Sequence, residues 1–180
     1  MFPKAHACAY VISAYRIAWF KVHRPLDYYQ AYFSVRCNDF DIESMISGYD
    51  SIKESLRTID NRKKDNNASN KDNSVYDVLQ IALEATARGI KFGKIDINKS
   101  DSINFVRAED ETLIPPFRTI DGLGDIVAQN IVNEREKAPF ISIEDLQKRA
   151  KISATLIEKM RFMGILDDMA ESNQISIFDL

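Results

Sequence analysis

Residues 113–136 read LIPPFRTIDGLGDIVAQNIVNERE, and only in this stretch does a tight glycine turn run directly into a well-formed helix. The turn is Ile120-Asp121-Gly122-Leu123-Gly124. Its two glycines permit positive φ angles and allow the backbone amides to point outward together. A concave set of N–H donors followed by a helix N-terminus is an anion-binding arrangement. We therefore expect an anion site at the turn.

The helix after the turn is expected to begin near Asp125 and to be amphipathic. The apolar positions expected on one face are Ile126, Val127, Ile131 and Val132. The polar positions expected on the other face are Gln129, Asn130, Asn133 and Arg135. The polar face thus offers hydrogen-bonding groups as well as charge, with Asn130 a candidate phosphate ligand.

A short Gly-x-Gly pattern alone is often a plain loop. With Ile120 before the turn, Leu123 between the glycines and a helix after them, however, this segment resembles the helix-hairpin-helix motif. That motif grips DNA phosphates through backbone amides without reading sequence. The resemblance implies that Gly122, Leu123, Gly124 and Asn130 bind DNA phosphate.

A weaker second copy is expected to follow the first. It comprises a helix over 143–150, the hairpin Lys151-Ile152-Ser153 and a helix over 154–163. Because this copy lacks the two glycines, we expect it to pack against the first copy and to bind phosphate poorly or not at all.

Composition narrows the class of protein. A formal net charge of -3 argues against an all-over basic coat for nucleic acid. The most apolar run, 5–20, contains His6 and Arg16, so we expect a helix buried in protein and no membrane partner. Cys8 and Cys37 indicate a reducing compartment, which predicts a cytoplasmic protein, and with the two histidines they match no common zinc spacing.

The N-terminal segment, residues 2–36, reads FPKAHACAYVISAYRIAWFKVHRPLDYYQAYFSVR. We expect one helix running to about Val22 and a second restarting at Pro25. His6 and Tyr10 lie one turn apart on one face, with Lys4 just before them. Two interpretations stay open. The pair is either core residues with satisfied polar tips, or a nucleic-acid contact with Lys4 and His6 on phosphate and Tyr10 stacking on a base.

This segment resembles the end of the fingers domain of bacterial DNA polymerase III alpha subunits of the PolC type. The positions that carry the resemblance are Phe2, Lys4, His6, Tyr10, Tyr15, Lys21, His23 and Pro25. The LIPPF segment and the IDGLG turn, at 113–124, also match that family. An abrupt apolar start adds to the expectation that the chain is a C-terminal piece of such a polymerase.

The resemblance implies nucleotidyl transfer in the parent protein, with Mg²⁺ and deoxynucleoside triphosphates. The Mg²⁺ ligands of the family lie in the palm, upstream of residue 1, so the fragment is expected to bind no metal and to be inactive alone. The resemblance also implies that Lys4, His6 and Tyr10 lie near the incoming nucleotide or the template. It implies that the turn at 120–124 contacts the primer-template duplex. The remainder of the polymerase is an implied partner.

The C-terminal residues carry a further implied site. Gln174-Ile175-Ser176-Ile177-Phe178 resembles the family's sliding-clamp motif, which implies that Gln174, Ile175, Ile177 and Phe178 bind the beta sliding clamp. Isoleucine replaces leucine twice, and Asp179 and Leu180 extend past the usual end.

The expected fold is mainly α with a small β element (α+β), in four parts. These are the end of the fingers (1–40), a helical segment (41–112), a tandem helix-hairpin-helix (113–166) and a flexible tail (167–180). Within the helical segment we expect an Asn-rich loop at 61–74 and a β-hairpin formed by strands near 90–97 and 103–106. Two other classes stay open: a non-enzymatic helix-hairpin-helix DNA-binding or repair module, and a clamp-binding adaptor without DNA contact.

Overall fold

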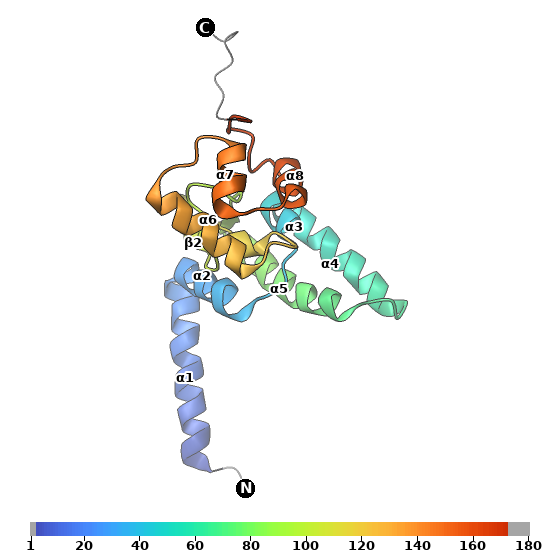
Figure 1. Ribbon diagram of the computed structural model, residues 1–180. Coiled ribbons are helices and arrows are strands. Elements are labelled where there is room, and N and C mark those ends of the chain that lie inside the picture. The colour runs from blue at the N-terminus through green and yellow to red at the C-terminus, as the bar shows by residue number, and fades with distance from the viewer. Residues whose placement is uncertain (1–2, 173–180) are drawn as a thin grey trace.

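Residues 3–172 are described by a computed structural model, in which α-helices predominate and three short strands form one small sheet (Figure 1). The helices are α1 (Lys4–His23), α2 (Pro25–Arg36), α3 (Ile42–Ser47), α4 (Tyr49–Lys64), α5 (Asn70–Ala87), α6 (Asp125–Lys137), α7 (Ile143–Ala150) and α8 (Ala154–Phe162), with a 3-10 helix, η1, at Phe117–Thr119. The strands are β1 (Lys91–Phe92), β2 (Val106–Arg107) and β3 (Thr112–Ile114). The expected class, mainly α with a small β element, is confirmed.

The first hydrophobic core lies among α2, α3, α4, α5 and the start of the sheet. Its fully buried side chains include Tyr29 and Phe33 from α2, and Phe33 meets Phe92 of β1 edge to face at 5.3 Å. Gly48 separates α3 from α4, and its φ of +95° is one that only glycine adopts easily.

The expected Asn-rich loop at 61–74 is much shorter in the structure. α4 continues to Lys64 and α5 already begins at Asn70. The reason is a capping box, in which the Ser69 side chain accepts from the Asp72 amide and the Asp72 side chain accepts from the Ser69 amide. This cap extends α5 into a segment whose composition alone indicates a loop.

The expected β-hairpin also pairs differently. β1 does not pair with β2, because β3 lies between them, parallel to β1 and antiparallel to β2. Ile95 and Ile97, expected in the first strand, lie outside it and are buried in the second core. The period-two pattern at 90–97 therefore reflects burial of alternate residues without a continuous strand.

The second hydrophobic core lies among η1, α6, α7 and α8. Ala128 and Ile131 of α6 are fully buried there. Ile126, expected on the buried face of this helix, is 80% exposed in its first turn instead. Met163 packs against both cores and so links the two halves of the body.

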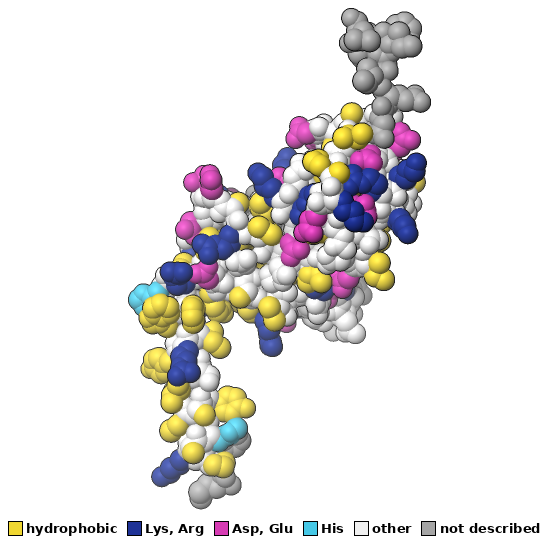
Figure 2. All heavy atoms as spheres, turned by 60° about the vertical axis from the view of Figure 1, so that its left-hand side comes forward, with side chains coloured by type: hydrophobic (Ala, Val, Ile, Leu, Met, Phe, Trp, Pro, Cys, Tyr) yellow, Lys and Arg dark blue, Asp and Glu magenta, His cyan; other side chains and the backbone are white. Residues whose placement is uncertain are grey.

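α1 extends away from the body and buries none of its side chains (Figure 1). Figure 2 shows hydrophobic side chains along this helix. Its large apolar residues, each half exposed or more, are Tyr10, Val11, Ile12, Tyr15, Ile17, Trp19, Phe20 and Val22. The expectation that this helix is buried in protein is therefore not met within this chain. Among residues 3–172, no helix is both long and apolar enough to cross a membrane.

Candidate nucleic-acid interface

The first hairpin turn is anchored from inside by two apolar residues. Ile120 and Leu123 are both buried, and the Leu123 N–H donates to the Ile120 carbonyl oxygen at 3.0 Å. Gly122, between them, has a φ of +89°, which a side chain would strain. Leu123 thus shapes the turn and engages its own amide internally, while Gly122 and Gly124 are exposed on its outer side.

Gly124 is the N-cap residue of α6, with φ −73° and ψ 156°, a conformation open to any residue. A Cβ built on Gly124 meets no atom within 4 Å. Neither the backbone conformation nor the packing of the free protein therefore requires glycine here. Because Gly124 carries no side chain, the first-turn amides of α6 remain accessible from outside.

The second hairpin reproduces this backbone with other residues. Lys151 adopts the left-handed conformation (φ 58°, ψ 44°) in the place of Gly122, and the buried Ile152 corresponds to Leu123. Ser153 is the N-cap of α8, and its hydroxyl accepts from the Leu156 amide at 3.3 Å. The two hairpins thus share a shape, but the serine hydroxyl covers the helix start that glycine leaves open.

The polar residues of α6 have divided roles. Arg135 donates to the carbonyl oxygens of Ile97 and Ser100 at 2.7 and 2.9 Å, so it supports the fold. Asn130 is half-buried and lies six residues beyond Gly124, about 9 Å further along the helix axis. The structure therefore brings Gly122, Leu123 and Gly124 together and places Asn130 apart from them.

Two carboxylates flank the turn, and basic side chains from other elements pair with both. Asp121 accepts from Lys71 of α5 at 2.9 Å, and Lys159 of α8 lies 3.3 Å from its other oxygen. These two lysines lower the pKa of the Asp121 carboxyl. Arg118 of η1 lies 3.8 Å from the Asp125 carboxylate.

Lys71 falls inside the stretch at 61–74, whose basic residues could contact a DNA backbone but whose composition favours a solvated loop. The sequence therefore did not identify Lys71 as a neighbour of the turn. The signal that identifies its helix is the Ser69-x-x-Asp72 capping box. That pattern predicts an ordered helix start, although it does not predict which surface the helix start meets.

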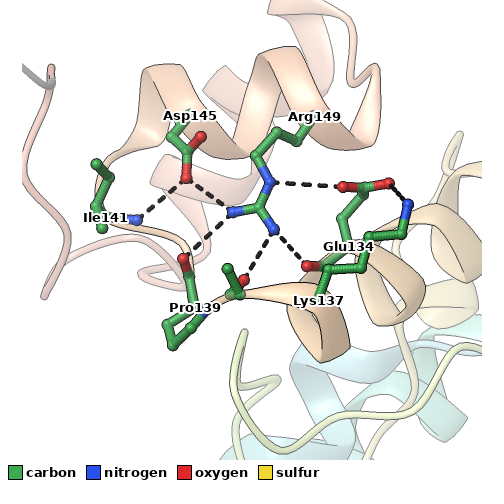
Figure 3. A network of polar contacts seen from close by, with 7 residues as sticks. Glu134, Lys137, Pro139, Ile141, Asp145 and Arg149 are labelled. Carbon is green, nitrogen blue, oxygen red and sulfur yellow. Dashed lines mark hydrogen bonds and ion pairs between the residues drawn. The ribbon is translucent and has the colours of Figure 1, made fainter.

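Arg149 of α7 fixes the two hairpins relative to each other (Figure 3). Its guanidinium donates to the carbonyl oxygens of Glu134, Ala138 and Pro139, the last two at 2.8 and 3.2 Å. It also pairs with the Asp145 carboxylate at 3.0 Å and lies 4.6 Å from the Phe140 ring centroid. One side chain thus joins the C-terminal end of α6 to α7.

Lys4, His6 and Tyr10 all lie exposed on α1. The His6 and Tyr10 rings meet edge to face at 4.6 Å, as expected for residues one turn apart. Their exposure argues against the core interpretation within this chain. Figure 1 shows this end of α1 far from α6, so these residues and the hairpin are separate surfaces.

Two further expectations concern the tail and the metal. Gln174, Ile175, Ile177 and Phe178 lie outside the described residues. Within residues 3–172, no three His, Cys, Asp or Glu side chains gather in a group able to hold a metal ion.

Comparison with known proteins connects this geometry to a family. Residues 89–175 match the family model of the helix-hairpin-helix motif. PolC-type DNA polymerase III of Streptococcus sanguinis (strain SK36) and that of Lacticaseibacillus paracasei are each 51% identical over 179 residues, and that of Streptococcus pyogenes serotype M5 is 49% identical. These alignments cover 99% of this chain and 12% of each relative, so the chain spans about one eighth of the relatives' length. Over nearly its whole length, the chain is thus homologous to a segment of PolC-type DNA polymerase III.

Proposed function

We propose that residues 113–166 hold duplex DNA by its phosphates, without reading sequence, as part of a replicative DNA polymerase of the PolC type. The Gly122–Gly124 turn and the first amides of α6 are the contact, and the partner is the backbone of primer-template duplex. Backbone amides at a helix N-terminus suit this ligand because they donate to anionic oxygens and read no base edges.

The observation that carries the proposal is Gly124. A glycine with an ordinary backbone conformation and open space around it has no structural need to be glycine. Such a residue is explained by something outside the chain that approaches the backbone closely. The hydroxyl of Ser153, at the matching place in the second hairpin, occupies part of the space that a phosphate would need.

α1 supports the view that this chain works within a larger polymerase. A helix with exposed apolar residues along its length is typical of an interface, and a free-standing module has no use for it. Other segments of the polymerase cover α1 in this proposal. Lys4, His6 and Tyr10 then lie near the incoming deoxynucleoside triphosphate or the template.

The parent activity is DNA-directed nucleotidyl transfer with Mg²⁺. Within residues 3–172 no three His, Cys, Asp or Glu side chains gather in one group, and the share that we propose for these residues is positioning. In this proposal, the C-terminal Gln174–Phe178 peptide tethers the polymerase to the beta sliding clamp. The polymerase replicates DNA in the cytoplasm.

The test is equilibrium binding of the 180-residue chain to fluorescein-labelled duplexes of unrelated sequence, followed by anisotropy across a salt series. We expect weak binding, equal affinity for all sequences and a linear fall of log affinity with log salt. Binding that is independent of salt, or confined to one sequence, contradicts the proposal.

A further inference from the structure

We propose that Lys71 and Lys159 bind DNA phosphate beside the hairpin turn, and that Asp121 holds both ammonium groups in place until the phosphate arrives. This inference rests on the proposed function and extends the interface from the hairpin to α5 and α8. Neither lysine belongs to the glycine turn or to the first turn of α6.

The two lysines converge on the turn from separate elements. Lys71, in the first turn of α5, and Lys159, near the end of α8, approach different oxygens of one carboxylate at 2.9 and 3.3 Å. Lys159 also donates to the Asp121 main-chain oxygen at 2.7 Å. Fifty residues separate Lys71 from Asp121, so the tertiary fold, and not chain proximity, brings this cation to the turn.

The local charge favours an anion. Two ammonium groups share the Asp121 carboxylate, which leaves an excess of one positive charge among these three side chains. The Asp39 carboxylate also acts on Lys71, but it is the weakest of the electrostatic influences on that lysine. The Asp125 carboxylate is offset by Arg118, and the N-terminus of α6 adds the partial positive charge of its free amides. The chain as a whole is negative, so this excess is a local feature of the hairpin.

The ion pairs are well placed to exchange partners. The Lys71 and Asp121 side chains are 59% and 72% exposed, and an exposed pair of this kind contributes little to stability because solvent screens it. A phosphate oxygen offers the same ammonium group an equivalent anionic acceptor. When DNA binds to the turn, the two lysines therefore exchange the Asp121 carboxylate for a DNA phosphate at little cost in stability.

The experiment separates contact with phosphate from neutralisation of Asp121. Lys71→Gln and Lys159→Gln are made in the natural chain and again with Asp121→Asn, and duplex affinity is measured across the salt series. Lys71 is the cleaner probe, since Lys159 also supports the turn backbone. Lys137→Gln is the matched control, because Lys137 is an exposed lysine paired with Glu134 at 2.6 Å, about 20 Å along α6 from the turn.

We expect each lysine variant to weaken binding in both backgrounds and to reduce the slope of log affinity against log salt by about 1. Asp121→Asn alone should tighten binding, and Lys137→Gln should leave the slope unchanged. If Lys71→Gln has no effect in the Asp121→Asn background, the lysine only neutralises aspartate and the inference is wrong. Gly124→Ser, measured in parallel, distinguishes the lysine contacts inferred here from the hairpin contact of the proposed function. If Gly124→Ser weakens DNA binding and the lysine variants do not, the lysine inference is wrong and the proposed function stands.

Discussion

Gly124 and Ser153 begin equivalent helices with nearly the same backbone conformation, −73°/156° and −68°/152° in φ/ψ. One position lacks a side chain and the other uses its hydroxyl to cap the helix. The hairpin backbone therefore accepts serine at this position, and the glycine at Gly124 is attributed to an external ligand.

Gly124→Ser should therefore stabilise the fold slightly while it weakens DNA binding. A serine N-cap is worth a few tenths of a kcal/mol over glycine. Loss of one amide-to-phosphate hydrogen bond costs about 1.5–3 kcal/mol, which is tenfold or more in affinity. Urea unfolding and duplex anisotropy measure the two effects, and Ser153→Gly is the matched control, with a small loss of stability. Unchanged affinity of Gly124→Ser would show that phosphate does not approach this residue.

Lys151→Gly should raise the stability of the chain. Lys151 adopts the left-handed conformation, which costs a non-glycine residue roughly 1–2 kcal/mol. Glycine removes that strain but gains freedom in the unfolded chain, so the net gain is about 0.5–1 kcal/mol. Lys148→Gly, in the last turn of α7, should instead lower the stability by up to about 1 kcal/mol. A loss of stability in Lys151→Gly on thermal unfolding would contradict the assigned strain.

Arg149→Met should destabilise the tandem hairpins by about 2–3 kcal/mol, because several carbonyl oxygens at the end of α6 lose a charged donor. Arg149→Lys should lose nearly as much, since one ammonium cannot replace the planar guanidinium. Arg57→Met, which removes an exposed pair with Glu54 at 3.5 Å, should change stability by less than about 0.5 kcal/mol. Denaturant unfolding of the three variants compares them directly.

Alkaline pH should unfold the first core through Tyr29. Burial raises the pKa of this phenol from 10.0 to about 12. A folded-state pKa above the unfolded value means that the stabilisation is complete below pH 10 and is lost as pH rises through about 12. Tyr29→Phe should flatten this part of the pH–stability curve. Burial also raises the pKa of Cys37 from 9.0 to about 11, so this thiol adds a comparable loss that begins about one pH unit lower, and Cys37→Ala identifies it.

Truncation after Asn173 should abolish binding to the beta sliding clamp and leave duplex binding unchanged. In the proposed function, the Gln174–Phe178 peptide supplies the apolar anchors for a groove on the clamp, whereas the hairpins lie upstream of the cut. Surface plasmon resonance on immobilised clamp measures the first effect. Clamp binding that survives the truncation would place the main contact elsewhere in the chain.

Sequence patterns predicted the parts of this fold that depend on local chemistry. The Gly122 turn, the helix from Asp125 and the restart of α2 at Pro25 follow from backbone preferences of glycine and proline, and all three are present. The second hairpin was also predicted, although no glycine marks it. Lys151 adopts a conformation that composition alone does not indicate.

The predictions that were wrong or incomplete concern features that depend on contacts between distant segments of the chain. β3 lies between β1 and β2, a pairing that alternation within 90–106 cannot reveal. The exposure of Ile126 and the contact of Lys71 with Asp121 arise from the tertiary fold as well. The candidate site was thus predictable at the turn itself, and its lysines were not.

The Arg149 network also determines how the interface moves. One guanidinium closes the end of α6 and belongs to α7, so the two hairpins cannot rotate against each other without breaking several charged hydrogen bonds at once. The Gly124 and Ser153 helix starts therefore behave as one rigid body before any DNA is present. In the proposed function, a duplex that meets the first hairpin therefore loses little binding energy to the ordering of that hairpin, because the second hairpin already holds it in place.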